Sequence, residues 1–206
     1  MLLAGGAAQR FGGLPKGLAV VDEIRIADRI LAALRGATDR QIVVSNDSAA
    51  DDWFPKLRVV EDETPGLGPL AGIETALRAA KGASIIVVAW DMPFVPTGLL
   101  RALRDAGLDA DVAVPESDSR RGLEPLCAYY GPACVPAIER RIAADDRRVI
   151  GFYDDVRVAR VPVAEVTRFG DPARLFMNVN TPEERILAEA HGASTDGGRD
   201  RQEEQR

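Results

Sequence analysis

The sequence predicts an α/β protein with a mostly parallel sheet, and two observations lead to this prediction. Short segments rich in Val, Ile and Leu alternate along the chain with segments of helical periodicity. Residues 84–90 form a continuous apolar run without a polar face. Such a run is typical of a central parallel strand that is buried on both faces.

Each element has its own local signal. The expected strands are short apolar segments at residues 2–4, 41–44, 57–60, 84–90, 111–114, 126–130 and 157–163. The expected helices carry apolar residues three and four positions apart or a proline in the first turn, and lie within residues 26–36, 73–82, 99–107 and 132–142. Thr181–Glu184 reads as a capping box with proline at its second position, so a last helix should begin there.

Composition limits the possible classes of function. The chain has 206 residues, 26 basic and 32 acidic side chains, a net charge of −6 and a mean hydropathy of −0.09. This acidic balance argues against binding to nucleic acid or to an anionic membrane. No apolar run of about 18 residues occurs, and the first residues lack the features of a signal peptide. We expect one domain over residues 1–191 and a disordered charged tail over residues 192–206.

Cysteine and histidine are rare, and this argues against a disulfide framework or a zinc site. Cys127 and Cys134 are the only cysteines and His191 is the only histidine. We expect buried, inert thiols, a structural histidine and a location in the reducing cytoplasm.

The first segment that suggests a binding or catalytic function is a glycine-rich loop directly after the first strand. It runs from Leu3 to Lys16 and contains four glycines, Arg10 and Lys16, but no acidic residue. Glycines allow the backbone to approach a phosphate closely, and the two cations can bind phosphate oxygens. The alternative is a surface loop whose glycines only make turns. The spacing fits neither a Walker A motif nor the dinucleotide-binding fingerprint.

A second glycine-rich segment leaves two interpretations open. Gly66, Gly68 and Ala71 match the dinucleotide fingerprint, and Asp91 lies twenty residues further on. However, three acidic residues precede the glycines and Pro69 removes one backbone N–H. A nicotinamide enzyme is therefore disfavoured. The plain alternative is that these glycines let a helix pack closely against the sheet.

Asp91 stands at the carboxyl end of the apolar strand, where open α/β sheets bind ligands. A carboxylate there can hold Mg²⁺, which bridges substrate phosphates; the alternative is a side chain that caps the next turn.

Near the end of the chain, Asn178 and Asn180 alternate along an extended segment before a helix. Both can face one crevice, or Asn180 can belong only to the turn.

Taken in order, these segments resemble the molybdenum cofactor guanylyltransferases of the MobA-like nucleotidyltransferase family. The similarity covers residues 2 to about 190. It is carried by the first glycine-rich loop and by four later blocks, which are Gly68–Gly72, Asp91–Phe94, Glu124–Leu126 and Asn178–Glu183. The resemblance implies a Rossmann-like nucleotidyltransferase fold and a nucleotidyltransferase that moves GMP from GTP to molybdenum–molybdopterin, releases pyrophosphate and requires Mg²⁺.

The resemblance also implies roles for individual residues. Arg10, Lys16 and Asp91 are the expected catalytic residues, and Asp91 is the expected Mg²⁺ ligand. Asn178 and Asn180 are expected on the pterin side. The expected contacts with GTP are Leu3, Ala4, Gly5, Gly6, Lys16, Asn46, Asp62, Gly68 and Asp91. Implied protein partners are a molybdoenzyme or an earlier protein of the pathway, and we expect a monomer.

Two departures from the family pattern and two rival functions accompany this hypothesis. Relatives usually carry several residues before the glycine-rich signature that complete the first strand, whereas here Met1 and Leu2 are nearly all of it. Residues 19–26 replace the usual turn into the first helix. The rivals are a molybdopterin cytidylyltransferase that uses CTP and a nucleotide-binding domain without catalytic activity.

Overall fold

The computed structural model describes residues 1–5, 15–64, 66–119, 122–181, 183, 184 and 186, and the statements below refer to these residues. Gly6, Arg10, His191 and the expected tail over residues 192–206 lie outside them. No helix in the described part of the chain is long and apolar enough to cross a membrane.

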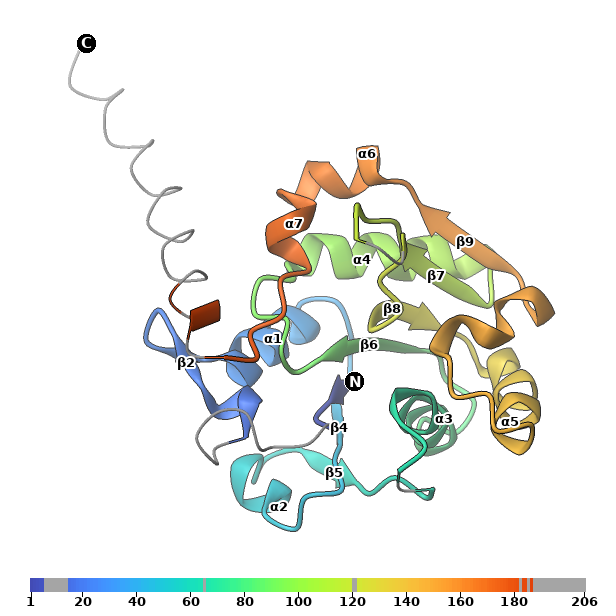
Figure 1. Cartoon of the computed structure of the whole chain (residues 1–206), viewed down its shortest axis with the longest axis horizontal. Coiled ribbons are helices and arrows are strands. Elements are labelled where there is room, and N and C mark those ends of the chain that lie inside the picture. Colours follow the sequence, from blue (N-terminus) through green and yellow to red (C-terminus); the bar gives the residue numbers. More distant parts are fainter. Residues whose placement is uncertain (6–14, 65, 120–121, 182, 185, 187–206) are drawn as a thin grey trace.

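Seven strands form one sheet in the order β5-β4-β1-β6-β8-β7-β9 (Figure 1). Their bounds are Leu2–Leu3 for β1, Ile42–Val44 for β4, Arg58–Val60 for β5, Ile85–Ala89 for β6, Val112–Pro115 for β7, Cys127–Tyr130 for β8 and Val158–Val161 for β9. Six strands run in the same direction, and only β8 is antiparallel to both of its neighbours. The predicted mostly parallel sheet is therefore confirmed.

Helices cover both faces of this sheet. The bounds are Ile26–Arg35 for α1, Ala50–Trp53 for α2, Pro69–Ala79 for α3, Thr97–Ala106 for α4, Val135–Ala143 for α5, Val163–Val166 for α6 and Pro172–Leu175 for α7. The apolar faces of α1 and α4 pack into one core cluster, and those of α3 and α5 pack into a second on the other face. Figure 1 shows α3 and α5 side by side.

The strands contribute side chains to both core clusters, because successive side chains of a strand point to opposite faces of the sheet. Leu2 lies in the α1/α4 cluster and Leu3 in the α3/α5 cluster. All five residues of β6 are buried, as the apolar run predicted. The first strand is only two residues long, which agrees with the short strand expected from the sequence.

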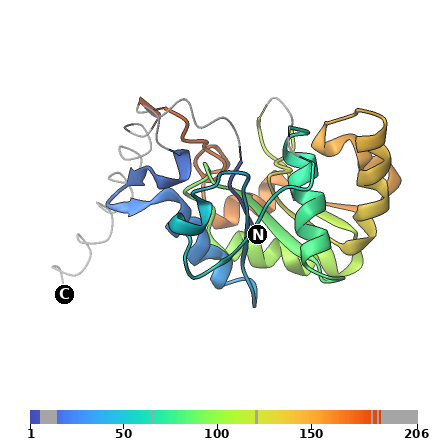
Figure 2. The same ribbon diagram turned by 90° about the horizontal axis from the view of Figure 1, so that it is seen from below.

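The segment that departs from the family pattern forms a small hairpin. Val20–Val21 (β2) pairs with Ile24–Arg25 (β3), and Asp22 and Glu23 make the turn with φ angles of 45° and 65°. Two consecutive residues of positive φ match the twist of a tight hairpin. Figures 1 and 2 show this hairpin at the opposite end of the molecule from α5. No sequence signal predicted this hairpin, because its turn lacks the usual Asn or Gly.

Candidate functional site

A cleft of about 610 Å³ opens at the carboxyl ends of the parallel strands. β1 pairs with β4 on one side and with β6 on the other. After β1 the chain builds β4 and β5 on one side of that strand, and it then crosses to the other side to form β6. Such a reversal of strand order leaves a crevice at the carboxyl ends of the strands, which is where open α/β sheets bind ligands. The residues that line the cleft include Leu3, Ala4, Gly5, Asn46, Asp62, Gly68, Asp91 and Asn178.

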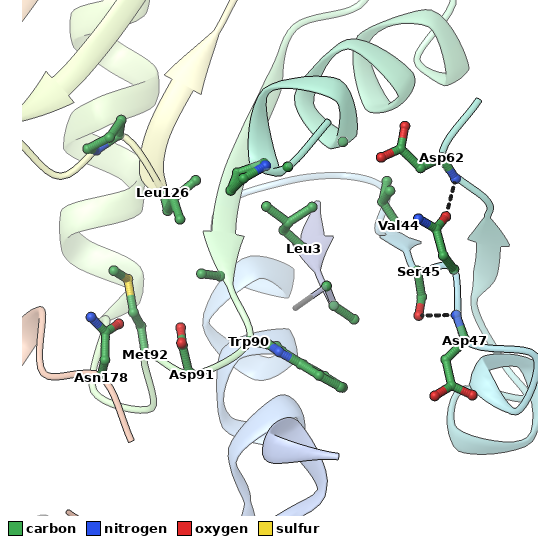
Figure 3. Close-up of a pocket in the computed structure, with 18 of the residues that line it drawn as sticks. Leu3, Val44, Ser45, Asp47, Asp62, Trp90, Asp91, Met92, Leu126 and Asn178 are labelled. Atoms are coloured by element: carbon green, nitrogen blue, oxygen red, sulfur yellow. Dashed lines mark hydrogen bonds between the residues drawn. The ribbon is translucent and has the colours of Figure 1, made fainter. Parts of the chain in front are cut away.

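Asp91 and Asn178 lie on one side of this cleft, and Asp47 and Asp62 lie on the other (Figure 3). Lys16, in the short 3-10 helix η2 (Lys16–Leu18), borders the Asp91 side. Its Nζ donates a hydrogen bond of 2.5 Å to Asn180 Oδ1 and lies 4.0 Å from Asp91 Oδ2. The structure thus brings together three of the predicted residues from distant parts of the sequence.

The carboxyl group of Asp91 is largely withdrawn from solvent, since its side chain is 19% exposed. Burial raises its pKa above the usual range, and the nearby Lys16 ammonium opposes this effect. Glu184 raises the pKa further through its negative charge. A second cation would stabilise the charged form of such a poorly solvated carboxylate, and its hard oxygen atoms are suitable ligands for Mg²⁺.

The segment around Asn180 is anchored by the predicted capping box. Glu184 Oε2 accepts hydrogen bonds from the backbone N–H groups of Asn180 and Thr181, and Thr181 Oγ1 accepts one from Glu184 N. Val179 N donates to the backbone oxygen of Asp91 at 2.8 Å. The segment around Val179 is therefore attached directly to the residue that follows β6, Asp91.

Asp62 is oriented by two residues from neighbouring elements. Asn46 Oδ1 accepts a hydrogen bond of 2.7 Å from Asp62 N, which joins the ends of β4 and β5 (Figure 3). Thr75 Oγ1, from the middle of α3, donates to Asp62 Oδ1 at 3.0 Å. Thr75 is not among the predicted site residues, since a threonine between apolar helix positions carries no signal of its own.

The second glycine-rich segment leads into α3 from β5, the strand at one edge of the sheet. Gly66 and Gly68 have φ angles of 87° and 79°, which only glycine adopts readily. A Cβ on Gly72 would lie 2.6 Å from Leu3 Cδ1. Close packing of helix on sheet therefore occurs at Gly72. A Cβ on Gly66 or Gly68 would meet no atom within 4 Å, so the plain interpretation does not hold for these two glycines, whose positive φ serves the turn.

Glu124, Pro125 and Leu126 reach the cleft because they precede the antiparallel strand β8. An antiparallel strand begins at the edge where its parallel neighbours end, so this sequence block meets the other blocks. Ser117 Oγ donates a hydrogen bond of 2.6 Å to Glu124 Oε1 and holds the carboxylate near the cleft. Neither the Ser117 nor the Glu124 side chain has a role predicted from the sequence.

Known proteins resemble this chain over nearly its whole length. Residues 1–157 match the model of the MobA-like NTP transferase domain. A probable molybdenum cofactor guanylyltransferase of Pelotomaculum thermopropionicum is 35% identical over 97% of this chain and 95% of its own length. The corresponding protein of Carboxydothermus hydrogenoformans is 32% identical over 88% of this chain and 89% of its own length.

A solved structure agrees with these relatives. The molybdopterin-guanine dinucleotide biosynthesis protein A of Archaeoglobus fulgidus has a TM-score of 0.77 and 26% identity, and the match covers 94% of this chain and 97% of that one. The predicted nucleotidyltransferase fold is therefore confirmed, and the curated relatives carry the enzyme name that the sequence motifs predicted. The chain belongs to the family of MobA-like NTP transferases.

Proposed function

We propose that this chain transfers GMP from GTP to molybdenum–molybdopterin and releases pyrophosphate. The names of the curated relatives, which match almost the full chain, support guanylyl transfer over the alternative that uses CTP. The structural observation that carries the proposal is the proximity of Lys16 and Asp91 beside the cleft at the carboxyl ends of the parallel strands. A cation and a carboxylate at this position suit a reaction between two phosphate groups.

In this reaction the protein has to position the two reactants and to neutralise the negative charge of their phosphate groups. The terminal phosphate of molybdopterin is already an anion at neutral pH, so no general base is needed. Lys16 is close enough to the cleft to offset negative charge that grows on the leaving pyrophosphate. Arg10 has the same proposed role, and it lies outside the described residues.

Asp91 is the residue that we assign to a divalent metal ion, with Mg²⁺ as the expected ion. Such an ion neutralises phosphate charge when it is bound. Within the described residues, no three His, Cys, Asp or Glu side chains are grouped so that they could hold a metal ion together. Phosphate and water oxygens would therefore complete the coordination, as is common for Mg²⁺.

Asp62 is the proposed contact for the guanine base. Its carboxylate can accept hydrogen bonds from the N1 and N2 donors of guanine, which cytosine does not offer in the same arrangement. Asn178, on the opposite side of the cleft, is the proposed contact on the pterin side. A single protein domain over residues 1–191, a cytoplasmic location, a monomeric state and the implied protein partners remain predictions.

A nucleotide panel tests the proposed function. The protein is heated with Mg²⁺ and GTP, CTP, ATP or UTP, because a bound ligand raises the unfolding temperature. Pyrophosphate release is then measured with molybdenum–molybdopterin as acceptor. We expect stabilisation and release with GTP. Equal effects of CTP would contradict the guanine assignment, and stabilisation without release would indicate a binding domain that lacks catalytic activity.

A further inference from the structure

Asn180 makes a contact that differs from the pterin-side role implied by the family resemblance. Its amide oxygen accepts the 2.5 Å hydrogen bond from Lys16 Nζ, although 164 residues separate the two in sequence. The same ammonium lies 4.0 Å from Asp91 Oδ2. The distances place Lys16 in direct contact with the neutral amide and at the outer limit of an ion pair with the carboxylate.

The position of Asn180 relative to Asp91 is set by the backbone. Glu184 Oε2 accepts from Asn180 N, and the next residue towards the N-terminus, Val179, donates to the backbone oxygen of Asp91. The Asn180 side chain takes no part in the capping box. A change of this side chain should therefore leave the local fold intact.

The charges of the three groups suggest why an amide stands here. A Lys16 ammonium in full contact with Asp91 would neutralise the carboxylate and compete with a metal ion for its oxygen atoms. A neutral amide binds one of the three N–H donors of lysine without cancelling its charge. Lys16 then keeps its positive charge for phosphate, and Asp91 keeps its oxygen atoms for a cation.

We propose that Asn180 is a positioning residue that holds the Lys16 ammonium away from Asp91 and so keeps the carboxylate accessible to a divalent cation. The inference rests on the proposed function, because it takes Asp91 as the metal ligand. Without the Asn180 amide, Asp91 Oδ2, which lies 4.0 Å from Lys16 Nζ, is a charged acceptor within reach of the ammonium. Lys16 and Asp91 then form a direct ion pair, which lowers the affinity of Asp91 for a divalent cation.

A double-mutant cycle on the full chain tests this proposal. The variants are Asn180→Ala, Lys16→Met and the double variant, and the measurement is the dissociation constant of Mn²⁺ without nucleotide, from the electron paramagnetic resonance signal of the free ion. We expect Asn180→Ala to weaken Mn²⁺ binding about tenfold. In the Lys16→Met background the same change should alter the constant by less than about twofold, because the competing ammonium is absent.

Glu183→Ala is the matched control, because Glu183 is an exposed residue of the same segment and should leave Mn²⁺ binding unchanged. Equal weakening by Asn180→Ala in both backgrounds would mean that Asn180 acts on the ion directly and would overturn the proposal. An unchanged constant in the wild-type background would overturn it as well. If Asn180→Ala fails to fold, Lys16→Met alone remains decisive, since weaker Mn²⁺ binding by that variant contradicts competition.

The outcomes separate this inference from the proposed function. Absence of Mn²⁺ binding to the wild-type protein would remove the metal assignment of Asp91 and the inference together. Mn²⁺ binding that does not respond to Asn180 as described would overturn the inference alone. The preference for GTP is measured independently in the nucleotide panel.

Discussion

The hydroxyl group of Thr75 donates a hydrogen bond of 3.0 Å to Asp62 Oδ1, so a buried residue of α3 orients a carboxylate at the end of β5. If Asp62 binds the guanine base, Thr75→Val should raise the KM for GTP about tenfold, which is about 1.4 kcal/mol and typical of one lost hydrogen bond to a charged group. The value of kcat should change little, because the proposed role of Asp62 is a contact with the base and not with the reacting phosphates. Steady-state kinetics of pyrophosphate release measure both constants.

Thr75→Ser is the control for this prediction, because it retains the hydroxyl group and should retain most of the affinity for GTP. An unchanged KM in the valine variant would show that the orientation of Asp62 is irrelevant to nucleotide binding.

Replacement of Asp91 should have opposite effects on activity and on stability. Asp91→Asn removes the proposed metal ligand, and we expect turnover to fall about 100-fold or more, or about 3 kcal/mol of barrier. The ligand-free variant should be more stable than the wild type at pH 7, because it does not bury a poorly solvated carboxylate. Thermal unfolding without nucleotide or metal measures the second effect.

The pH dependence of that stability follows from the raised pKa of Asp91. In the pH range between the unfolded and the folded pKa, the folded protein binds more protons, so wild-type stability falls as pH rises. The loss is complete above the folded pKa and absent below the ordinary aspartate value. The stability gain of Asp91→Asn should therefore disappear in acid, and a gain that is independent of pH would contradict this explanation.

Lys16→Ala tests the proposed catalytic charge. We expect the barrier to rise by about 3 kcal/mol, as is typical when one charge-stabilising donor is lost. Added Mg²⁺ should not restore the rate, because an ion held by Asp91 would not take the place of the ammonium proposed to offset charge on the leaving pyrophosphate. Pyrophosphate release at saturating GTP measures the change, and turnover like that of the wild type would remove the role of Lys16.

Gly72→Ala should destabilise the protein through a specific clash. The new Cβ would lie 2.6 Å from Leu3 Cδ1, and Leu3 is buried between α3 and the sheet. Overpacking of this kind costs about 1–3 kcal/mol in unfolding free energy, measured by urea titration. Leu3→Val in the same variant removes the clashing carbon and should recover part of the loss. Strictly additive effects of the two changes would argue against the clash.

The two tryptophans offer a direct signal of ligand binding. Trp90 precedes Asp91, lines the cleft and stacks on Trp53 at a centroid distance of 6.2 Å. The indole N–H of Trp90 is buried and has no hydrogen-bond partner within the described part of the chain. We expect GTP with Mg²⁺ to change the intrinsic fluorescence of the wild type and of Trp53→Phe. A change that persists in Trp90→Phe would place its origin elsewhere.

Local patterns predicted most elements of the fold. The helical periodicity from Ile26 to Leu34 and the end at Gly36 correspond to α1, and the apolar run corresponds to β6. The capping box at Thr181 forms the expected hydrogen bonds. The β2–β3 hairpin was not predicted, and nothing in the local pattern of β8 reveals that it runs against its neighbours.

The sequence by itself determined the alternation of strands and helices, which depends on local spacing, and the family, which depends on the order of the motifs. Through the family resemblance it also predicted that Lys16, Asp62 and Asp91 share one site. The tertiary structure decided which side chains meet there. Asn180 contacts Lys16 and Thr75 contacts Asp62 only after distant elements pack together. A hydrogen bond between residues far apart in sequence depends on the relative placement of whole elements, and no local pattern encodes that placement.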